Sequence, residues 1–365
     1  MFEIKTPEKY VSEPGALNDA GKYIRAYGTT GLVVAGTTAF KTVQDALKKS
    51  FLENHVSFTL FPFAGYPTLE KAKQIAEEAE KNRAEFIVAV GGGRVHDASK
   101  AAGTLAGLPV ISVPTVAATC APWAAVSIIY TKEGDFEQFY ANPHTPRVIL
   151  ADTKILIDAP ERYIKAGIVD TFAKWYENSL GITGSGDPLP LRISVYSAKL
   201  AFDELEKKAS AALEEKKTGK ITNNAVDTID SVFYLAGLVG SFVGSRAYSG
   251  FAHPFYHSSR RIPASRVMLH GELVAFGIIT QLVLQKKSDK EIRETIQRLA
   301  AFDEAFTLSD LKLEDSDLPV IADRILAEFP DYTQFGFGLT TEEIVEGFKT
   351  ADILVREYRE NVQKK

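Results

Sequence analysis

The sequence predicts an α/β domain built on a parallel sheet, followed by an all-α domain. Up to about Asp152, short apolar runs alternate with amphipathic stretches, a pattern typical of a parallel sheet covered by helices on both faces. After Pro160 the strand-like runs stop and longer helical patterns take over. The 365 residues are enough for two domains. We expect an α/β domain over residues 1–157 and a helical domain over residues 158–365.

Each element follows from a local pattern. Strands of the sheet are expected at five apolar runs, namely GLVVAG from 31, VSFTLFPF from 56, EFIVAV from 85, LPVISVPT from 108 and RVILAD from 147. Residues 37–54 and 67–84 carry apolar positions at helical spacing, and Pro67 and Thr68 are start signals for the second helix. Two strand-like runs around residues 132–135 predict a β-hairpin inserted in the sheet domain. Residues 191–217 predict a long helix.

Composition argues against several classes of partner. The chain has 42 basic and 47 acidic residues and a net charge of -5, which provides no electrostatic footprint for nucleic acid or an anionic membrane. No apolar run approaches the roughly 18 residues that span a bilayer, and the N-terminus lacks a secretory pattern. We therefore expect a soluble, cytoplasmic protein that acts on a small molecule.

Two turns that follow neighbouring strands are candidates for ligand binding. GGGRVH, residues 91–96, follows an apolar strand and opens a small-residue helix, so free backbone N–H groups and the helix dipole favour an anion such as phosphate. It is neither G-x-G-x-x-G, because His96 stands at the third glycine position, nor a P-loop. The alternative is a tight connection that binds nothing. The next strand ends in VPTVAATCAP, a small-residue turn that leaves room for a flat ligand.

The second half of the sequence contains several side chains that could ligate a metal ion. His253, His257 and His270 are three of the six histidines and lie within 18 residues of one another. If Pro254 opens a helix, His253 and His257 share one side of it, and His270 begins the next apolar helix. The single cysteine, Cys120, excludes a disulfide and a cysteine-based zinc site. Two imidazoles and a carboxylate suit a catalytic zinc or ferrous ion, although each histidine alone is equally compatible with a core role.

The motifs GGGRVHDASK, VPTVAATCAP, AGIVDTFAKWYE, AHPFYH and LHGELVAFG together resemble the iron-containing, or type III, alcohol dehydrogenases. The resemblance is greatest to the glycerol dehydrogenase branch, and ATCAPW with DTFAKWYE is similar to its hydroxycarboxylate dehydrogenase subgroup. It spans nearly the whole chain. It implies a Rossmann-like domain and a helical domain, the dehydroquinate synthase-like architecture, and a homo-oligomer.

The resemblance also implies roles for individual residues. The pyrophosphate of the cofactor would contact Gly92, Gly93, Arg94, Val95, His96 and Asp97, and the rest of the cofactor would lie along Thr115, Ala118, Val126 and Tyr130. The metal ligands would be Asp170, His253 and His270, with His257 beside them as a proton relay. Cys120 stands where the glycerol branch has an aspartate that touches a polyol hydroxyl, which makes Cys120 either a catalytic-site residue or an apolar filler. Arg94 and the longer spacing from His253 to His257 are further departures.

Cofactor and substrate follow from neighbouring residues. Where the family has an acidic residue after the first long strand, this chain has Gly36, followed by Thr37 and Thr38, so a 2′-phosphate would meet no carboxylate. We therefore expect NADP, with NAD second. The resemblance to the hydroxycarboxylate subgroup implies a small 2-oxo acid or hydroxycarboxylate as substrate, and arginines close to the histidines, which pair well with carboxylates, agree with this. These arginines are Arg246, Arg260, Arg261 and Arg266, of which at least two are expected to be surface residues on a loop.

Three alternatives stay open at this point. A polyol or simple aldehyde is the second choice of substrate. A lyase resembling dehydroquinate synthase would share the architecture and use NAD only transiently. A catalytically silent nucleotide-binding protein would explain the departures at Cys120 and in the histidine spacing.

Overall fold

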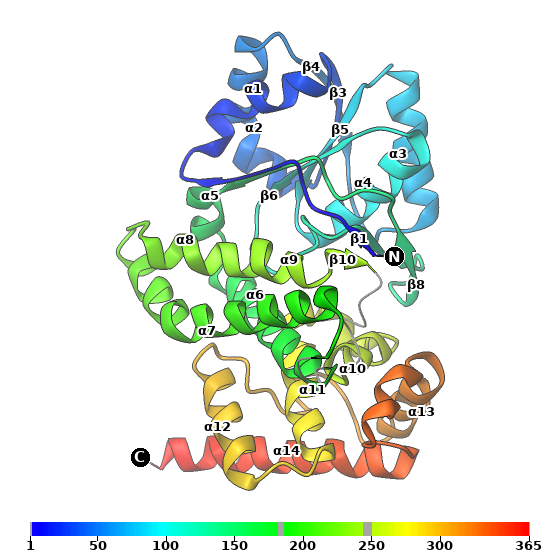
Figure 1. The fold of residues 1–365 in the computed structure, drawn as a ribbon, viewed down its shortest axis with the longest axis vertical. Helices are drawn as coiled ribbons and strands as arrows, with labels where there is room; N and C mark the ends of the chain where they lie inside the picture. The colour runs from blue at the N-terminus through cyan, green and yellow to red at the C-terminus, as the bar shows by residue number, and fades with distance from the viewer. Residues whose placement is uncertain (1, 182–185, 244–249, 365) are drawn as a thin grey trace.

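The computed structural model describes residues 2–181, 186–243 and 250–364 and divides into a sheet half and a helical half (Figure 1). Among the described residues, no helix is long and apolar enough to cross a membrane. The α/β domain with a helical remainder that the sequence predicts is confirmed.

The sheet half is built on six parallel strands. Their order across the sheet is β2 (Lys9–Glu13), β9 (Val148–Asp152), β6 (Val110–Pro114), β5 (Phe86–Gly91), β3 (Thr30–Ala35) and β4 (Ser57–Pro62). The five predicted strands are all present. The sixth, β2, was not expected because KYVSE is short and largely polar, and it forms an edge of the sheet that pairs only with β9.

Helices cover both faces of this sheet (Figure 1). Alternate side chains of each strand point to opposite faces, so one face packs on α1 (Ala20–Ile24) and α2 (Thr37–Glu53). The other face packs on α3 (Leu69–Lys81) and α4 (Gly93–Ala106). The predicted hairpin is also confirmed. Strands β7 (Val126–Tyr130) and β8 (Phe136–Ala141) pair antiparallel, and β7 packs on α4.

The helical half surrounds one apolar core. Its helices are α6 (Glu161–Asn178), α7 (Leu189–Lys217), α8 (Asn223–Asp230), α9 (Ala236–Val239), α10 (Ala252–Ser259), α11 (His270–Leu284), α12 (Asp289–Ala300), α13 (Leu318–Glu328) and α14 (Thr341–Gln363). The long helix expected over 191–217 is confirmed as α7. Capping boxes of Ser288 with Glu291 and of Thr340 with Glu343 fix the starts of α12 and α14.

Two connections join the halves. The short strand β1 (Glu3–Ile4) crosses from the N-terminus to pair antiparallel with β10 (Phe242–Val243) of the helical half. The helix α5 (Thr153–Asp158) lies between them and contacts both β9 and α8. Because α5 packs on both halves, a division at residues 157 and 158 stays a prediction.

Candidate active site

Strand order marks the place where a ligand of the sheet half is expected. From β3 the chain moves outward to β4 and then returns past β3 to β5, so the direction of travel reverses between β3 and β5. In open parallel sheets the crevice outside such a switch point, at the carboxyl ends of the strands, is the usual ligand site. Gly36 follows β3 here, and the glycine turn follows β5.

The glycine turn brings the backbone close to its neighbours. A Cβ at Gly91 would lie 2.8 Å from the Val95 side chain, and one at Gly93 would lie 3.3 Å from the Thr119 hydroxyl. Gly92 caps α4 without a side chain, so the first N–H groups of the helix stay accessible. This geometry fits an anion-binding turn.

Lys100, which sequence reasoning missed, holds the second turn against the first. Its ammonium donates to the carbonyls of Ala121, Ala124 and Val126 at 2.9, 3.1 and 2.5 Å and pairs with Asp97 at 3.0 Å. Burial raises the pKa of Asp97, and the charge of Lys100 opposes the rise. A lysine three residues after Asp97 on a buried helix face was the signal in the sequence.

Two of the residues that the sequence assigned to cofactor binding, His96 and Gly36, do not line the cavity described below. The His96 side chain is fully buried, and its Nε2 donates to the Gly91 carbonyl at 3.1 Å, so it supports the turn from behind rather than lining the cavity. Burial, reinforced by the charge of Lys100, lowers the pKa of His96 to about 3. Gly36 caps α2 and does not line the cavity either, whereas Thr38, Ala39 and Thr42 do.

A cavity of about 1760 Å³ lies between the two halves. Its walls come from both turns of the sheet half, from α6, α10 and α11, and from the segment around Phe329. Most residues assigned from the sequence line it: Gly92, Gly93, Arg94, Val95, Asp97, Thr115, Ala118, Cys120, Val126, Tyr130, Asp170, His253, His257 and His270.

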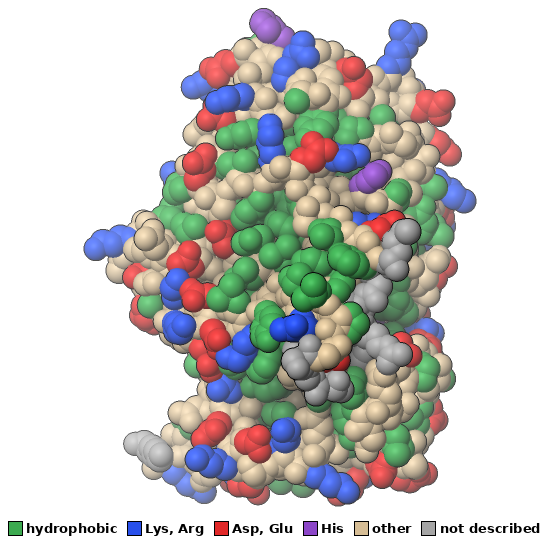
Figure 2. Space-filling view, viewed as in Figure 1, with side chains coloured by type: hydrophobic (Ala, Val, Ile, Leu, Met, Phe, Trp, Pro, Cys, Tyr) green, Lys and Arg blue, Asp and Glu red, His purple; other side chains and the backbone are tan. Residues whose placement is uncertain are grey.

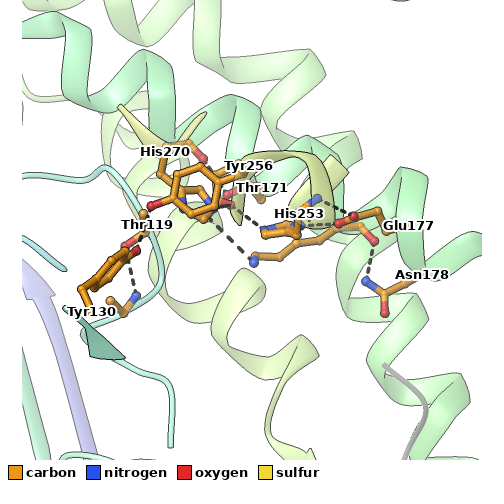
Figure 3. A network of polar contacts seen from close by, with 12 residues as sticks. Thr119, Tyr130, Thr171, Glu177, Asn178, His253, Tyr256 and His270 are labelled. Atoms are coloured by element: carbon orange, nitrogen blue, oxygen red, sulfur yellow. Dashed lines mark hydrogen bonds and ion pairs between the residues drawn. The ribbon is translucent and has the colours of Figure 1, made fainter. Parts of the chain in front are cut away.

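Three side chains from three helices converge at this cavity (Figure 3). Asp170 comes from α6, His253 from α10 and His270 from the first position of α11. The Asp170 Oδ1 atom lies 3.2 Å from His253 Nε2 and 3.0 Å from His270 Nε2. One ligand atom from each residue lies within 4.8 Å of the others.

The donor set fits a divalent metal ion. Glu177 is fully buried and accepts from the His253 backbone at 2.9 Å and from its Nδ1 (Figure 3). The other ring nitrogen, Nε2, is left directed at Asp170. A carboxylate behind a ligating imidazole is a common second partner in metal sites. Sequence reasoning missed Glu177, although it lies seven residues after Asp170 on α6.

Charges around these groups act in opposite directions. Burial raises the pKa of Asp170, but Lys174, His270 and the imidazole hydrogen bonds outweigh it and hold that pKa well below its usual value. Burial lowers the pKa of His253, but Glu177 and Asp170 outweigh it and raise that pKa to about 9. Burial dominates at His270, whose pKa is lowered. A metal ion held by Nε2 would displace the proton that this atom otherwise donates to Asp170, while the Nδ1 proton would stay directed at Glu177.

Other cavity residues complete the site. His257 is buried among the rings of Phe136, Phe139 and Phe329, with centroid distances of 4.5, 5.3 and 5.6 Å. The Tyr130 and Tyr256 hydroxyls are 2.9 Å apart and join the hairpin to α10. Burial raises the pKa of Cys120, so its thiol is neutral beside Lys174.

The arginines separate into different environments. Arg260 lines the cavity, whereas Arg261 pairs with Glu328 and Arg266 pairs with Asp135, so neither of these two lines it. Arg246 lies outside the described residues. Of the three arginines of this group that the structure describes, Arg260 lines the cavity and the other two do not.

The sheet half has a glycine turn that fits a phosphate group, and the helical half has three side chains that fit a metal ion. Together they are typical of proteins that bind a nucleotide and a metal between two halves of this kind. The family model "Iron-containing alcohol dehydrogenase" matches residues 7–153. A glycerol dehydrogenase of Escherichia coli O6:H1 is 30% identical over 358 residues, which are 96% of each chain. The chain therefore belongs to the iron-containing alcohol dehydrogenase family and is an oxidoreductase.

Two further likenesses agree with this assignment. The hydroxycarboxylate dehydrogenase A of Escherichia coli K12 is 28% identical over 326 residues, 88% of each chain. The crystal structure of a probable glycerol dehydrogenase from Sinorhizobium meliloti 1021 superposes with a TM-score of 0.87 at 21% identity, over 98% of this chain and 100% of the other. The second likeness shows the shared fold.

Proposed function

We propose that this oxidoreductase transfers hydride between a nicotinamide dinucleotide and a small 2-oxo acid or hydroxycarboxylate. The observation that carries the proposal is the convergence of Asp170, His253 and His270 on a cavity that the glycine turn also lines. A divalent ion, zinc or iron, held by the triad would supply Lewis-acid polarisation of the substrate oxygen, and the nicotinamide would supply or accept hydride.

In this proposal the protein's own residues bind the cofactor and orient the groups that hold the metal. The N–H groups at the start of α4 hold the pyrophosphate beside Gly92, Gly93 and Arg94. Thr115, Ala118, Val126 and Tyr130 bound the rest of the cofactor. Glu177 fixes the His253 ring, and the aromatic rings around His257 exclude water. Burial holds the pKa of His257 low, so His257 would accept a proton and pass it on rather than keep it.

We also propose NADP as the preferred cofactor, with NAD second. Thr38 and Thr42 line the cavity near the start of α2, and no Asp or Glu from α2 lines the described cavity. Free N–H groups at that helix start favour a phosphate. Thermal stabilisation by NADPH but not NADH supports this preference, and the reverse ranking contradicts it.

A polyol is the second candidate substrate, because the 30% identical relative is a glycerol dehydrogenase. The neutral Cys120 thiol offers a polyol no carboxylate acceptor at that position, which is why the 2-oxo acid stands first. The test is a panel of 2-oxo acids, aldehydes and polyols with both cofactors after metal reconstitution, read from the absorbance of reduced nicotinamide. Net oxidation of the reduced nicotinamide cofactor in the presence of 2-oxo acids supports the proposal. Turnover only with polyols, or without net change in the nicotinamide, contradicts it.

We propose in addition that the protein is a homo-oligomer. Hydrophobic side chains gather near the middle of the face that bears α7, α8 and α9 (Figure 2). Exposed apolar residues recur along α7 at Leu189, Ile193, Tyr196 and Leu200. A contiguous apolar surface of this kind is typical of a protein interface.

A further inference from the structure

Arg260 lies on the same side of α10 as two histidines of the site. It directly follows the last residue of α10, and the positions 253, 257 and 260 are four and three residues apart, so they form one stripe along the helix. All three side chains line the cavity between the halves. The guanidinium therefore faces the space in which the substrate is proposed to bind.

This guanidinium is buried without an acidic partner. Arg260 is 3% exposed, and among the described residues no carboxylate lies within 4.0 Å of it. Its Nη1 donates to the Arg266 carbonyl at 2.8 Å and its Nη2 to the Tyr66 hydroxyl at 3.4 Å, while its Nε has no hydrogen-bond partner in the described part of the chain. A buried charge that lacks a counter-ion is costly, and an anionic ligand would offset that cost.

The other basic side chains that line the described cavity are in different situations. Lys5 donates to the Asn142 carbonyl and lies 3.8 Å from Glu3. Lys174 lies 4.0 Å from the Asp170 carboxylate. Arg94 is exposed and packs over the Tyr66 ring at 4.4 Å from its centroid. Arg260 alone among these four is both buried and without a carboxylate neighbour.

The position of Arg260 favours the substrate over the cofactor. The pyrophosphate site is proposed at the start of α4, where Arg94 is exposed, whereas Arg260 is buried and extends from the helix that carries His253. Both guanidinium groups lie over the Tyr66 ring, at 4.4 and 5.8 Å from its centroid. Burial and the two other imidazoles of the site hold the pKa of His257 low, and the charge of Arg260 acts in the same direction. Arg260 and His257 are therefore within electrostatic reach of one another.

We propose that Arg260 binds the carboxylate of the 2-oxo acid and so determines the preference for anionic over neutral carbonyl compounds. This inference rests on the proposed function. A guanidinium matches a carboxylate through two parallel N–H donors, and Arg260 keeps donor hydrogens that the Arg266 carbonyl and the Tyr66 hydroxyl do not take. With the carboxylate held there, the carbonyl end of the substrate would point along α10 towards His253.

The test compares pyruvate with pyruvamide, in which a neutral amide replaces the carboxylate. In the metal-loaded enzyme, Arg260→Gln is expected to lower kcat/KM for pyruvate by about 10- to 100-fold, mainly through KM, because a charge-assisted hydrogen bond is lost. Turnover of pyruvamide is expected to change less than about twofold. Arg260→Lys, which keeps the charge but not the fork, is expected to fall between the wild type and Arg260→Gln.

Arg293→Gln is the control, because this arginine pairs with Asp289 and Glu357 and none of these three residues lines the cavity. It is expected to leave both substrates unaffected. Equal losses for pyruvate and pyruvamide in Arg260→Gln would show a purely structural role and overturn the inference, as would no change for either. If Arg260→Gln does not fold, the same comparison with Arg260→Lys decides.

A binding measurement separates this inference from the proposed function. Oxamate has the shape and charge of pyruvate but is not reduced, and oxamide is its neutral counterpart. Calorimetry with the NADPH- and metal-loaded enzyme is expected to show oxamate binding that Arg260→Gln weakens about 10-fold or more, with oxamide unaffected. If oxamate binds as expected but pyruvate is not turned over, the proposed reaction is refuted and the carboxylate site at Arg260 is supported. Absence of oxamate binding by the wild type would overturn the site itself.

Discussion

At the scale of single residues, the imidazoles of His253 and His270 are proposed to hold the metal through atoms that both lie within 3.2 Å of Asp170 Oδ1. Replacing either one, His253→Ala or His270→Ala, is expected to abolish bound metal and turnover while the fold is kept, because two remaining ligands are too few for a stable site. Metal content, turnover and circular dichroism measure these three properties.

Glu177→Gln provides a graded comparison for these two variants. It keeps every ligand but weakens the hydrogen bond that orients His253, so metal affinity is expected to fall by about 10- to 100-fold. Full activity in His253→Ala or His270→Ala would refute the metal assignment.

Glu304 lies away from the triad, beside the ion pair of Arg162 with Glu272. Burial, followed by the charge of Glu272, raises its pKa from the usual value of 4.5 to about 9. Between these two pH values the folded protein holds a proton that the unfolded chain releases, so Glu304 makes the protein less stable as pH rises. Glu304→Gln removes this effect.

The stability of Glu304→Gln relative to the wild type is expected to grow from pH 5 to pH 9, by on the order of 5 kcal/mol, in denaturant unfolding. Glu346→Gln, at an exposed position on α14, serves as the control and is expected to show no such trend. A difference between Glu304→Gln and the wild type that is the same at both pH values would contradict the prediction.

At the scale of elements, glycines set the distance between the helices that carry the triad. A Cβ at Gly271 of α11 would lie 1.9 Å from the Ala166 carbonyl of α6. Gly271→Ala is therefore expected to push α11 from α6, separating His270 from Asp170, with a loss of about 1–3 kcal/mol in stability and a lower metal affinity.

Thermal unfolding and metal titration measure these two effects. Gly186→Ala is the control, since a Cβ there would meet nothing within 4 Å. Because alanine favours helices over glycine by nearly 1 kcal/mol, a rise in stability for Gly271→Ala would show that the helices are not in such close contact.

At the scale of the whole molecule, the apolar stripe on α7 is proposed to join copies of the chain. Its residues Ile193, Tyr196 and Leu200 are 43%, 60% and 49% exposed, at spacings that place them on one side of the helix. The double variant Ile193→Asp with Tyr196→Asp is expected to reduce the molar mass seen by light scattering, because charges would have to be buried at the contact.

Lys349→Asp, at an exposed position on α14, is expected to leave the mass unchanged. A monomeric wild type, or a variant with the mass of the wild type, would contradict this assignment of the interface.

Local pattern was sufficient for most of the fold. Five sheet strands, the hairpin and the long helix α7 follow from the periodicity of apolar residues, and the triad followed from motifs that resemble a family. Strand β2 did not, because an edge strand owes its place to a single partner strand far away in the sequence.

Only the tertiary structure decided which side chains support the site. It placed Glu177 behind His253, directed Lys100 to three carbonyls between Ala121 and Val126, and placed Arg260 at the cavity while Arg261 paired with Glu328. The physical reason is that the role of a charged side chain depends on its partners and on its burial. Both are properties of packing between distant segments, which spacing along the chain does not record.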